Sequence, residues 1–508
     1  MKKESPLAYH RPLLLRSRVL SCASIFLLGG LLLPAMAQNA GNVDPTQTRD
    51  WAPGAIDNAR LFLCDRIRVP CPSSQQSSQP TPSDIPQLET DRDPHGQIGT
   101  FQPGGATTTE DNAFFQNIGA NGRTCFTCHQ PQTGWTISAA STRLRFETSG
   151  GMDPLFRPVD GATCQTDDVS TPFARLQAYS LLINKGLIRI GIPMPAGAQF
   201  AVTHVDDPYG CTTNPVTGLT SPTTGIVSMY RRPLPSTNLG FLTTIMWDGR
   251  EPSLASQSVD ATLIHAQADS PPSPEQQAEI VAFETGLFTA QSFDQRALAL
   301  DAAGATGGPV TLSQQLAKFS VGVNDPFGSS FNPNIFNLYK PWLNLPAGAI
   351  DQARKSIARG EEVFNTTKIN ITGVAGLANT VGFCGTCHDT PNVGNHSVKL
   401  PLNIGISNAG ADSPPALDIS GLPVFTLQCN DGQTFVVTDP GRALITGNCA
   451  DIGKVKGPIL RGLAGRAPYF HNGSAATLMD VVNFYNQRFG IGFTTQQKQD
   501  LVNFLNTL

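Results

Sequence analysis

The sequence predicts a mainly α protein made of two related halves. Its apolar residues recur in short stretches with a period close to 3.6, and no convincing set of alternating, period-two strands appears. A Cys-x-x-Cys-His pentapeptide occurs once in each half, at 125–129 and at 384–388. Charged residues make up only 15% of the chain while Gly and Pro number 48 and 40, which indicates globular structure rich in loops.

The length and the net charge of the chain exclude some classes of protein. A chain of 508 residues is too long for one ordinary domain. The net charge is −4 and no run of basic residues follows the first twenty positions, which argues against a nucleic-acid partner.

The N-terminus has the pattern of an export signal. Five Lys or Arg residues precede an apolar run at 19–33, and Ala35-Met36-Ala37 forms a small-x-small cleavage site. The run is shorter than the ~20 residues that span a membrane. We therefore expect residues 1–37 to be a signal peptide cleaved after about Ala37, and the mature protein to be periplasmic and not membrane-spanning. An uncleaved anchor is the alternative.

Helices are expected at 274–290, 350–364 and 494–508, where apolar residues fall on one face. Residues 72–90 are rich in Ser, Gln and Pro and indicate a linker. A Gly-rich break at 302–309 separates the halves. The predicted domains are an N-terminal extension at 38–110, a first domain at 111–310 with an insertion at about 140–230, and a second domain at 311–508.

The halves also share a turn and a closing helix. Residues 247–254 read Trp-Asp-Gly-Arg-Glu-Pro-Ser-Leu, and residues 471–478 read His-Asn-Gly-Ser-Ala-Ala-Thr-Leu. Further along, 277–283 resembles 498–504. These matches predict a duplication.

Each pentapeptide is the attachment motif of a c-type haem. Two thiols must reach the two vinyl groups of one porphyrin, and the next residue must present an imidazole to the iron. The sequence therefore predicts two c-type cytochrome domains with two covalently bound haems, attached through Cys125 and Cys128 and through Cys384 and Cys387. His129 and His388 are the expected proximal ligands. Outside the pentapeptides, no Cys or His residues have zinc-ligand spacing.

Six further cysteines follow the signal, and an even number in an exported chain predicts disulfides. The pairs nearest in sequence are Cys64–Cys71, Cys164–Cys211 and Cys429–Cys449, although six cysteines allow 15 connectivities.

Three segments resemble one family. They are Trp247-Asp248-Gly249-Arg250, Arg359-Gly360-Glu361-Glu362-Val363-Phe364-Asn365 and Ala467-Pro468-Tyr469-Phe470-His471-Asn472-Gly473-Ser474. They resemble the bacterial di-haem cytochrome c peroxidase and MauG superfamily over roughly residues 111–508. The chain departs from the pattern in the long stretch between His129 and Trp247, and residues 38–110 have no counterpart.

The resemblance implies a second axial ligand on the second haem, fourteen residues after His471. That position is Tyr485, as in MauG-like proteins, with Met479 as the competitor on the same helix. The same count from Trp247 gives Ala261, which cannot bind iron. The first haem is therefore expected to be open, unless a loop residue binds the iron, for which the candidates are His204, Met152 and Met194.

The resemblance also implies roles around the first haem. Gln267 stands where the family has a Glu, so His265 is the nearest titratable group for acid–base catalysis. Gln257 matches a pocket Gln, Trp247 is expected between the haems, and Arg461 is expected to pair with haem propionates. Relatives hold calcium between the domains. At about the position of the Asn that would bind the ion, this chain has Arg232, which argues against a calcium site.

The predicted function is that of a di-haem oxidoreductase. It would activate hydrogen peroxide or dioxygen at the first haem and use the second as an electron reservoir. The electrons would come from a small redox protein or from a protein or organic substrate. Two alternatives remain: a purely electron-transferring cytochrome, and a dioxygen-dependent oxygenase resembling the rubber oxygenases. An empty axial position distinguishes the enzymes from the electron carrier.

Overall fold

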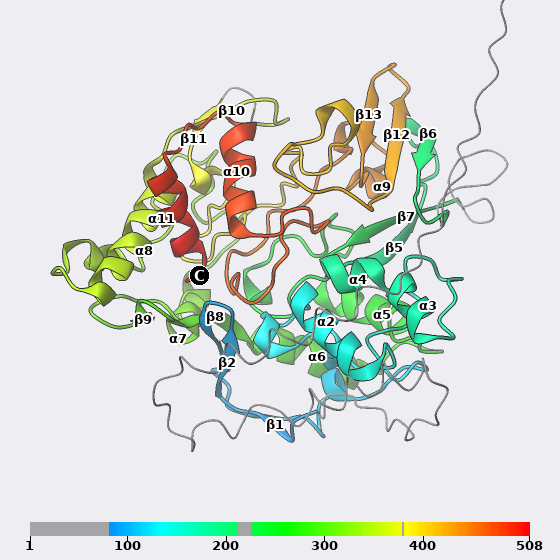
Figure 1. Ribbon diagram of the computed structural model, residues 1–508, viewed down its shortest axis with the longest axis horizontal. Helices are drawn as coiled ribbons and strands as arrows, with labels where there is room; N and C mark the ends of the chain where they lie inside the picture. Colours follow the sequence, from blue (N-terminus) through cyan, green and yellow to red (C-terminus); the bar gives the residue numbers. More distant parts are fainter. Residues whose placement is uncertain (1–80, 212–224, 378–379) are drawn as a thin grey trace, which may run out of the picture. The chain divides into compact units, whose positions relative to one another are not determined.

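The computed structural model describes residues 81–211, 225–377 and 380–508, and these three ranges belong to one unit (Figure 1). The predicted signal peptide and the Cys64–Cys71 pair lie outside the described residues. Within these three ranges, no helix is long and apolar enough to cross a membrane. The predicted boundary between domains at 310 and 311 stays a prediction.

Helices are short and separated by long connections. The α-helices of the described ranges are α2 (Ala139–Ser149), α3 (Pro172–Ala178), α4 (Ser180–Lys185), α5 (Leu254–Ile264), α6 (Pro274–Gly286), α7 (Pro309–Ser313), α8 (Ala349–Thr366), α9 (Ala443–Thr446), α10 (Leu478–Arg488) and α11 (Thr495–Leu505). The three predicted helices are confirmed as α6, α8 and α11. Helix α6 ends earlier than expected because residues 288–294 form a strand.

The strands form five small antiparallel sheets. They are β1 (Asp84–Ile85), β2 (Leu88–Asp93), β3 (Gly96–Phe101), β4 (Thr107–Thr108), β5 (Ile188–Pro193), β6 (Phe200–Asp206), β7 (Ile226–Arg231), β8 (Phe288–Asp294), β9 (Leu298–Ala299), β10 (Ile369–Ile371), β11 (Thr380–Gly382), β12 (Val424–Cys429) and β13 (Thr434–Val437). The sheet orders are β1-β4, β2-β3-β8-β9, β5-β7, β13-β12-β6 and β10-β11.

The expectation of a mainly α fold is wrong, since 31% of the described residues are helical and 17% are in strands or bridges. Most strands are too short, or too evenly buried, to show period-two alternation. Strand β7, for example, is buried along nearly its whole length. Strand β12 does alternate, with Phe425, Leu427 and Cys429 buried, and the burial of β2 and β10 alternates as well.

The expectation of two cytochrome domains related by duplication is also not what the described residues show. Strands from distant parts of the chain pair with one another instead. Strand β6, from the predicted insertion, pairs with β12, more than two hundred residues later. Strand β3, from the predicted N-terminal extension, pairs with β8. Part of the expected linker is likewise structured, since β1 and β2 begin within it.

Two packed regions surround the Cys-x-x-Cys-His motifs. Near the first motif, Phe114, Phe115, Phe126, Trp135 and Phe283 form one buried cluster. Near the second motif, α8 and α11 lie side by side and share a core (Figure 1). Two of the predicted disulfides are confirmed, Cys164–Cys211 and Cys429–Cys449. The second of them joins β12 to the short turn after α9.

Candidate functional site: two cavities at the Cys-x-x-Cys-His motifs

The two pentapeptides adopt the same local structure. Each pair of cysteines lies on a 3₁₀ turn, Cys125–Thr127 and Cys384–Thr386. The Nδ1 atom of His129 lies 2.9 Å from the carbonyl oxygen of Trp135, and that of His388 lies 2.7 Å from the carbonyl oxygen of Gly394. A carbonyl can only accept, so Nδ1 carries the proton in each ring and the Nε2 lone pair is available for a metal.

The cysteines and histidines of both motifs are half-buried and neutral. Burial lowers the pKa of His129 and of His388 to about 4, so both imidazoles are uncharged at pH 7. None of the four cysteines is in a disulfide. Burial raises the pKa of Cys384 and Cys387 to about 12, so these groups are thiols rather than thiolates. Neutral imidazoles and reduced thiols are the groups that haem attachment requires.

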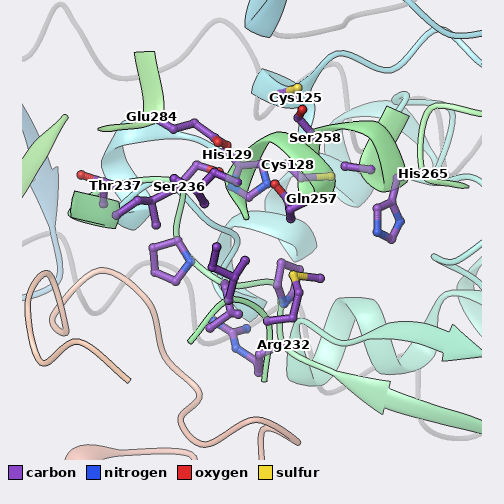
Figure 2. Close-up of a pocket in the computed structure, with 18 of the residues that line it drawn as sticks. Cys125, Cys128, His129, Arg232, Ser236, Thr237, Gln257, Ser258, His265 and Glu284 are labelled. Atoms are coloured by element: carbon purple, nitrogen blue, oxygen red, sulfur yellow. The ribbon is translucent and has the colours of Figure 1, made fainter. Parts of the chain in front are cut away.

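Each motif opens onto its own large cavity. The cavity beside His129 has an empty volume of about 1600 Å³, and that beside His388 about 1720 Å³. Figure 2 shows the first cavity with Glu284 and His265 at opposite sides of the view and Arg232 below. We call the two spaces the first and second cavity.

Two turns of equal geometry face these cavities. Met246 and Phe470 both have a φ of +64°, and each is followed two residues later by Asp or Asn and then by a glycine with positive φ. Helices α5 and α10 begin seven residues after Trp247 and His471, respectively, and both span 11 residues. The helices are capped alike, by Ser253 and Thr477. Residues at the same distance from Trp247 and from His471 therefore occupy equivalent positions on the two helices.

The same helix face lines each cavity. Helix α5 and its C-cap contribute Leu254, Gln257, Ser258, Ala261 and His265 to the first cavity. Helix α10 and its C-cap contribute Leu478, Val481, Val482, Tyr485 and Phe489 to the second. Ala261 and Tyr485 thus occupy equal positions, as the sequence predicts. Among the described residues, neither the Tyr485 hydroxyl nor the Gln257 amide has a hydrogen-bond partner, so both groups are free to meet a ligand.

Trp247 lines both cavities. Its Nε1 donates to the carbonyl oxygen of Arg232 over 2.8 Å, and its own carbonyl accepts from the Lys456 amide over 2.8 Å. The indole ring lies 6.1 Å from the ring of His471, edge to face. Backbone contacts therefore fix this aromatic ring at the boundary between the cavities.

Three buried cations share that boundary. Arg232, Lys456 and Arg466 line both cavities, and among the described residues none of them forms an ion pair with a carboxylate. Burial and the Arg466 charge lower the pKa of Lys456 to about 7, and burial with the same charge lowers that of Arg232 to about 9. Buried cations without counterions fit a group that brings its own carboxylates, as haem does with its propionates.

Arg461 lies at the first cavity rather than the second. It donates from Nε and Nη2 to the carbonyl oxygen of Asn392, and its buried Nη1 has no partner in the described structure. Burial lowers its pKa to about 10. An orphaned N–H on a residue that lines this cavity is a second feature that fits a carboxylate-bearing cofactor.

The other candidate iron ligands lie elsewhere. His204 is exposed on β6, Met152 is exposed, and neither they nor Met194 and Met479 line the first or the second cavity. The sequence analysis missed Met246, which does line the first cavity, immediately before Trp247. It also missed Glu284 on α6, a buried carboxyl there whose pKa burial raises to about 7. A carboxyl on an otherwise apolar helix face was the available signal for Glu284.

No family model matches the chain. It is similar to two proteins of Denitromonas iodatirespirans. One is the cytochrome-c peroxidase IdrP1, 39% identical over 15% of this chain and 24% of that protein. The other is the cytochrome-c peroxidase IdrP2, 33% identical over 25% of this chain and 36% of that protein. The chain thus spans only a minor part of the length of these relatives.

Two solved structures align with much of the chain, at low scores. A MauG-like protein associated with microbial copper homeostasis is 17% identical over 78% of this chain and 86% of its own, with a TM-score of 0.36. Hydrazine synthase of Kuenenia stuttgartiensis is 14% identical over 73% of this chain and 93% of its own, with a TM-score of 0.30. Because both scores are low, these structures carry no argument, and it is the sequence relatives that confirm the resemblance indicated by the motifs.

Proposed function

We propose that this chain, which resembles the di-haem cytochrome c peroxidase and MauG superfamily, is an exported di-haem oxidoreductase that reduces hydrogen peroxide at its first cavity. Cys125, Cys128 and His129 would hold one haem, and Cys384, Cys387 and His388 the other. The observation that carries the proposal is the pair of equal helix positions, where the small Ala261 lines the first cavity and Tyr485 lines the second.

Haem iron with an open coordination position supplies the electron exchange with peroxide. The reduction of one peroxide to two waters consumes two protons and two electrons. His265 would take a proton at Nε2 from hydrogen peroxide and give it to the oxygen that leaves as water. The Gln257 amide, free of partners among the described residues, can orient the oxidant or a water.

The second cavity is suited to storing electrons. Tyr485 would hold the second haem through its phenolic oxygen, a hard donor that stabilises the ferric state. Trp247, which lines both cavities, offers an aromatic ring through which an electron can pass between them. Arg232, Lys456 and Arg466 would neutralise the propionates of both haems, and Arg461 those of the first.

The same tyrosine favours a second candidate function. A ferric state stabilised by phenolate accepts electrons less readily from a small redox protein than one bound by a thioether. Oxidation of a protein or organic substrate in the MauG manner, with peroxide or dioxygen as oxidant, is therefore the alternative to peroxidase turnover. Because Met246 lines the first cavity, a purely electron-transferring cytochrome is the third candidate.

Rapid mixing of the reduced protein with each oxidant separates these functions. We expect peroxide to reoxidise the haems much faster than air does, with two electrons consumed per peroxide. A reduced small cytochrome or cupredoxin should then sustain turnover. Reoxidation by dioxygen alone would favour the oxygenase, and failure of both oxidants would leave only electron transfer.

The proposed periplasmic location rests on the N-terminal sequence, which lies outside the described residues. The mature protein isolated from a periplasmic extract should begin near residue 38. Recovery of the intact N-terminus in the membrane fraction would contradict the proposal.

A further inference from the structure

A carboxylate from the long insertion reaches the edge of the first cavity. Asp160 lies between α2 and α3, and its Oδ2 is 2.6 Å from Nδ1 of His265 at the C-cap of α5. Both residues line the first cavity. The Asp160 side chain is 4% exposed and that of His265 is 30% exposed, so the carboxylate is buried behind a partly open imidazole.

Arg123, just before the first motif, fixes this pair. Its Nη1 donates to Asp160 Oδ1 over 2.7 Å and to the His265 carbonyl over 3.2 Å. Its remaining donors bind the carbonyls of Pro154 and Leu155 at 2.9 and 2.7 Å. The arginine thus ties the insertion, the first motif and the end of α5 together, and it leaves Asp160 only one orientation.

The charge of Asp160 settles which nitrogen of His265 carries the proton. Burial opposes ionisation, but the Arg123 charge and the His265 hydrogen bond outweigh it and lower the pKa of Asp160 to about 2. An ionised carboxylate can only accept, so Nδ1 of His265 must donate. In the neutral ring Nε2 then keeps its lone pair, and no described residue hydrogen-bonds to it.

We propose that Asp160 is a positioning residue that fixes His265 in the Nδ1–H form, with Nε2 ready to accept a proton in the first cavity. The insertion would then serve the reaction by supplying this carboxylate. The inference rests on the proposed function of His265 in handling the protons of peroxide. In the second cavity Phe489 occupies the corresponding position on α10, and the histidine–carboxylate pair there, His396 with Asp389 at 2.6 Å, comes from the loop after the second motif.

Asp160→Asn tests the proposal without removing the side chain. Arg123 still requires an oxygen opposite Nη1, so the new amide NH₂ faces Nδ1 of His265. That nitrogen must then accept, and the ring proton moves to Nε2. We expect nitrogen NMR of the ¹⁵N-histidine-labelled holoprotein, reduced and carbon-monoxide-bound, to show the Nδ1–H form in the native protein and the Nε2–H form in the variant. Signals absent from His265→Ala identify the residue.

The kinetic readout asks whether Asp160 acts through His265. Asp160→Asn should slow the reaction with peroxide about 10²-fold or more, because a misplaced ring proton blocks a general base. In a His265→Ala background the same change should have no further effect. Asp153→Asn is the matched control, since Asp153 is a buried carboxylate of the same segment that pairs with Arg145. It should leave both the ring proton and the rate unchanged.

Each outcome decides one point. An Nε2–H form in the native protein overturns the proposal, and this spectrum needs no variant to fold. An unchanged ring proton in Asp160→Asn, or an equal rate loss with and without His265, overturns it as well. If the ring proton moves but His265→Ala reacts at the native rate, the proposed role of His265 in the reaction fails. The pairing with Asp160 would then stand as structure alone.

Discussion

Helices α5 and α10 present the same face to different cavities, and the residues on those faces differ in kind. At four matched positions, the first cavity has Gln257, Ser258, Ala261 and His265, whereas the second has Val481, Val482, Tyr485 and Phe489. The first wall, the face of α5, is polar and has the small Ala261 at its centre. The second wall is apolar except for one phenol at the same central position.

The proximal side of each cavity shows no such difference. Both motifs form the same 3₁₀ turn, and both histidines donate Nδ1–H to a carbonyl six residues further along. If each motif holds a haem, as proposed, the contrast teaches that the motif specifies where the haem is held, while the side chains of α5 and α10 determine what that haem can do. The chemical difference between the two cavities therefore lies in a few side chains of α5 and α10, and substitutions at these positions can test it.

The largest expected effect comes from removing one attachment site. Cys125→Ala with Cys128→Ala, or Cys384→Ala with Cys387→Ala, should lose one covalent haem and leave roughly half of the Soret absorbance. Mass spectrometry of the native protein should find two covalent haems, and a smaller number would contradict the account. Cys429→Ser with Cys449→Ser, which removes a disulfide, should keep both haems.

The next effect tests the polar wall. His265→Ala should keep both haems and slow the reaction with peroxide about 10²–10⁴-fold, the usual contribution of a positioned acid–base group. Stopped-flow absorbance measures the rate. Gln267→Ala is the control, because Gln267 lies two residues beyond and its side chain bonds to Asn121. A native rate for His265→Ala would place the acid–base group elsewhere.

The phenol of the second wall should control the potential of one haem only. Tyr485→Met should raise the reduction potential of the second haem, because a thioether stabilises ferric iron less than a phenolate does, and should leave the first unchanged. Tyr469→Phe is the matched control, since Tyr469 also lines the second cavity but its hydroxyl already donates to the Leu463 carbonyl over 3.0 Å. Equal potentials in native protein and Tyr485→Met would exclude ligation by the tyrosine.

The smallest effect concerns the closing helices, where Glu284 on α6 lines the first cavity and Leu505 on α11 the second. Burial raises the pKa of Glu284 to about 7, so its protonated form is favoured by folding. The stability it provides is complete below about pH 4.5 and is lost as the pH rises through 7, by about 3 kcal/mol at most.

Glu284→Gln should remove that part of the pH dependence. Urea unfolding of the holoprotein at pH 5 and at pH 8 measures it, as a smaller difference between the two unfolding free energies in the variant. Glu279→Gln, on the same helix but outside the cavity, should retain the native difference. An unchanged difference in Glu284→Gln would mean that this carboxyl does not titrate as its burial indicates.

The features of the structure that depend on local patterns and fixed spacings could be predicted from the sequence. The periodicity of 350–364 predicted α8, and counting from Trp247 and His471 reached the matched positions Ala261 and Tyr485 because both helices begin seven residues after their turns. Long-range pairing could not be predicted. Asp160 meets His265 across 105 positions of sequence, and β6 meets β12 across an even longer stretch. No local pattern encodes such contacts.

The central claim is that the first haem is open while the second is closed by Tyr485. The electron paramagnetic resonance spectrum of the fully oxidised protein tests it most directly, because it distinguishes five-coordinate or water-bound iron from iron with two strong protein ligands. The account predicts one high-spin and one low-spin ferric haem in equal amounts. Two low-spin haems, both before and after reduction of one of them, would contradict it. Met246 would then be the described residue to replace first, since it is the methionine that lines the first cavity.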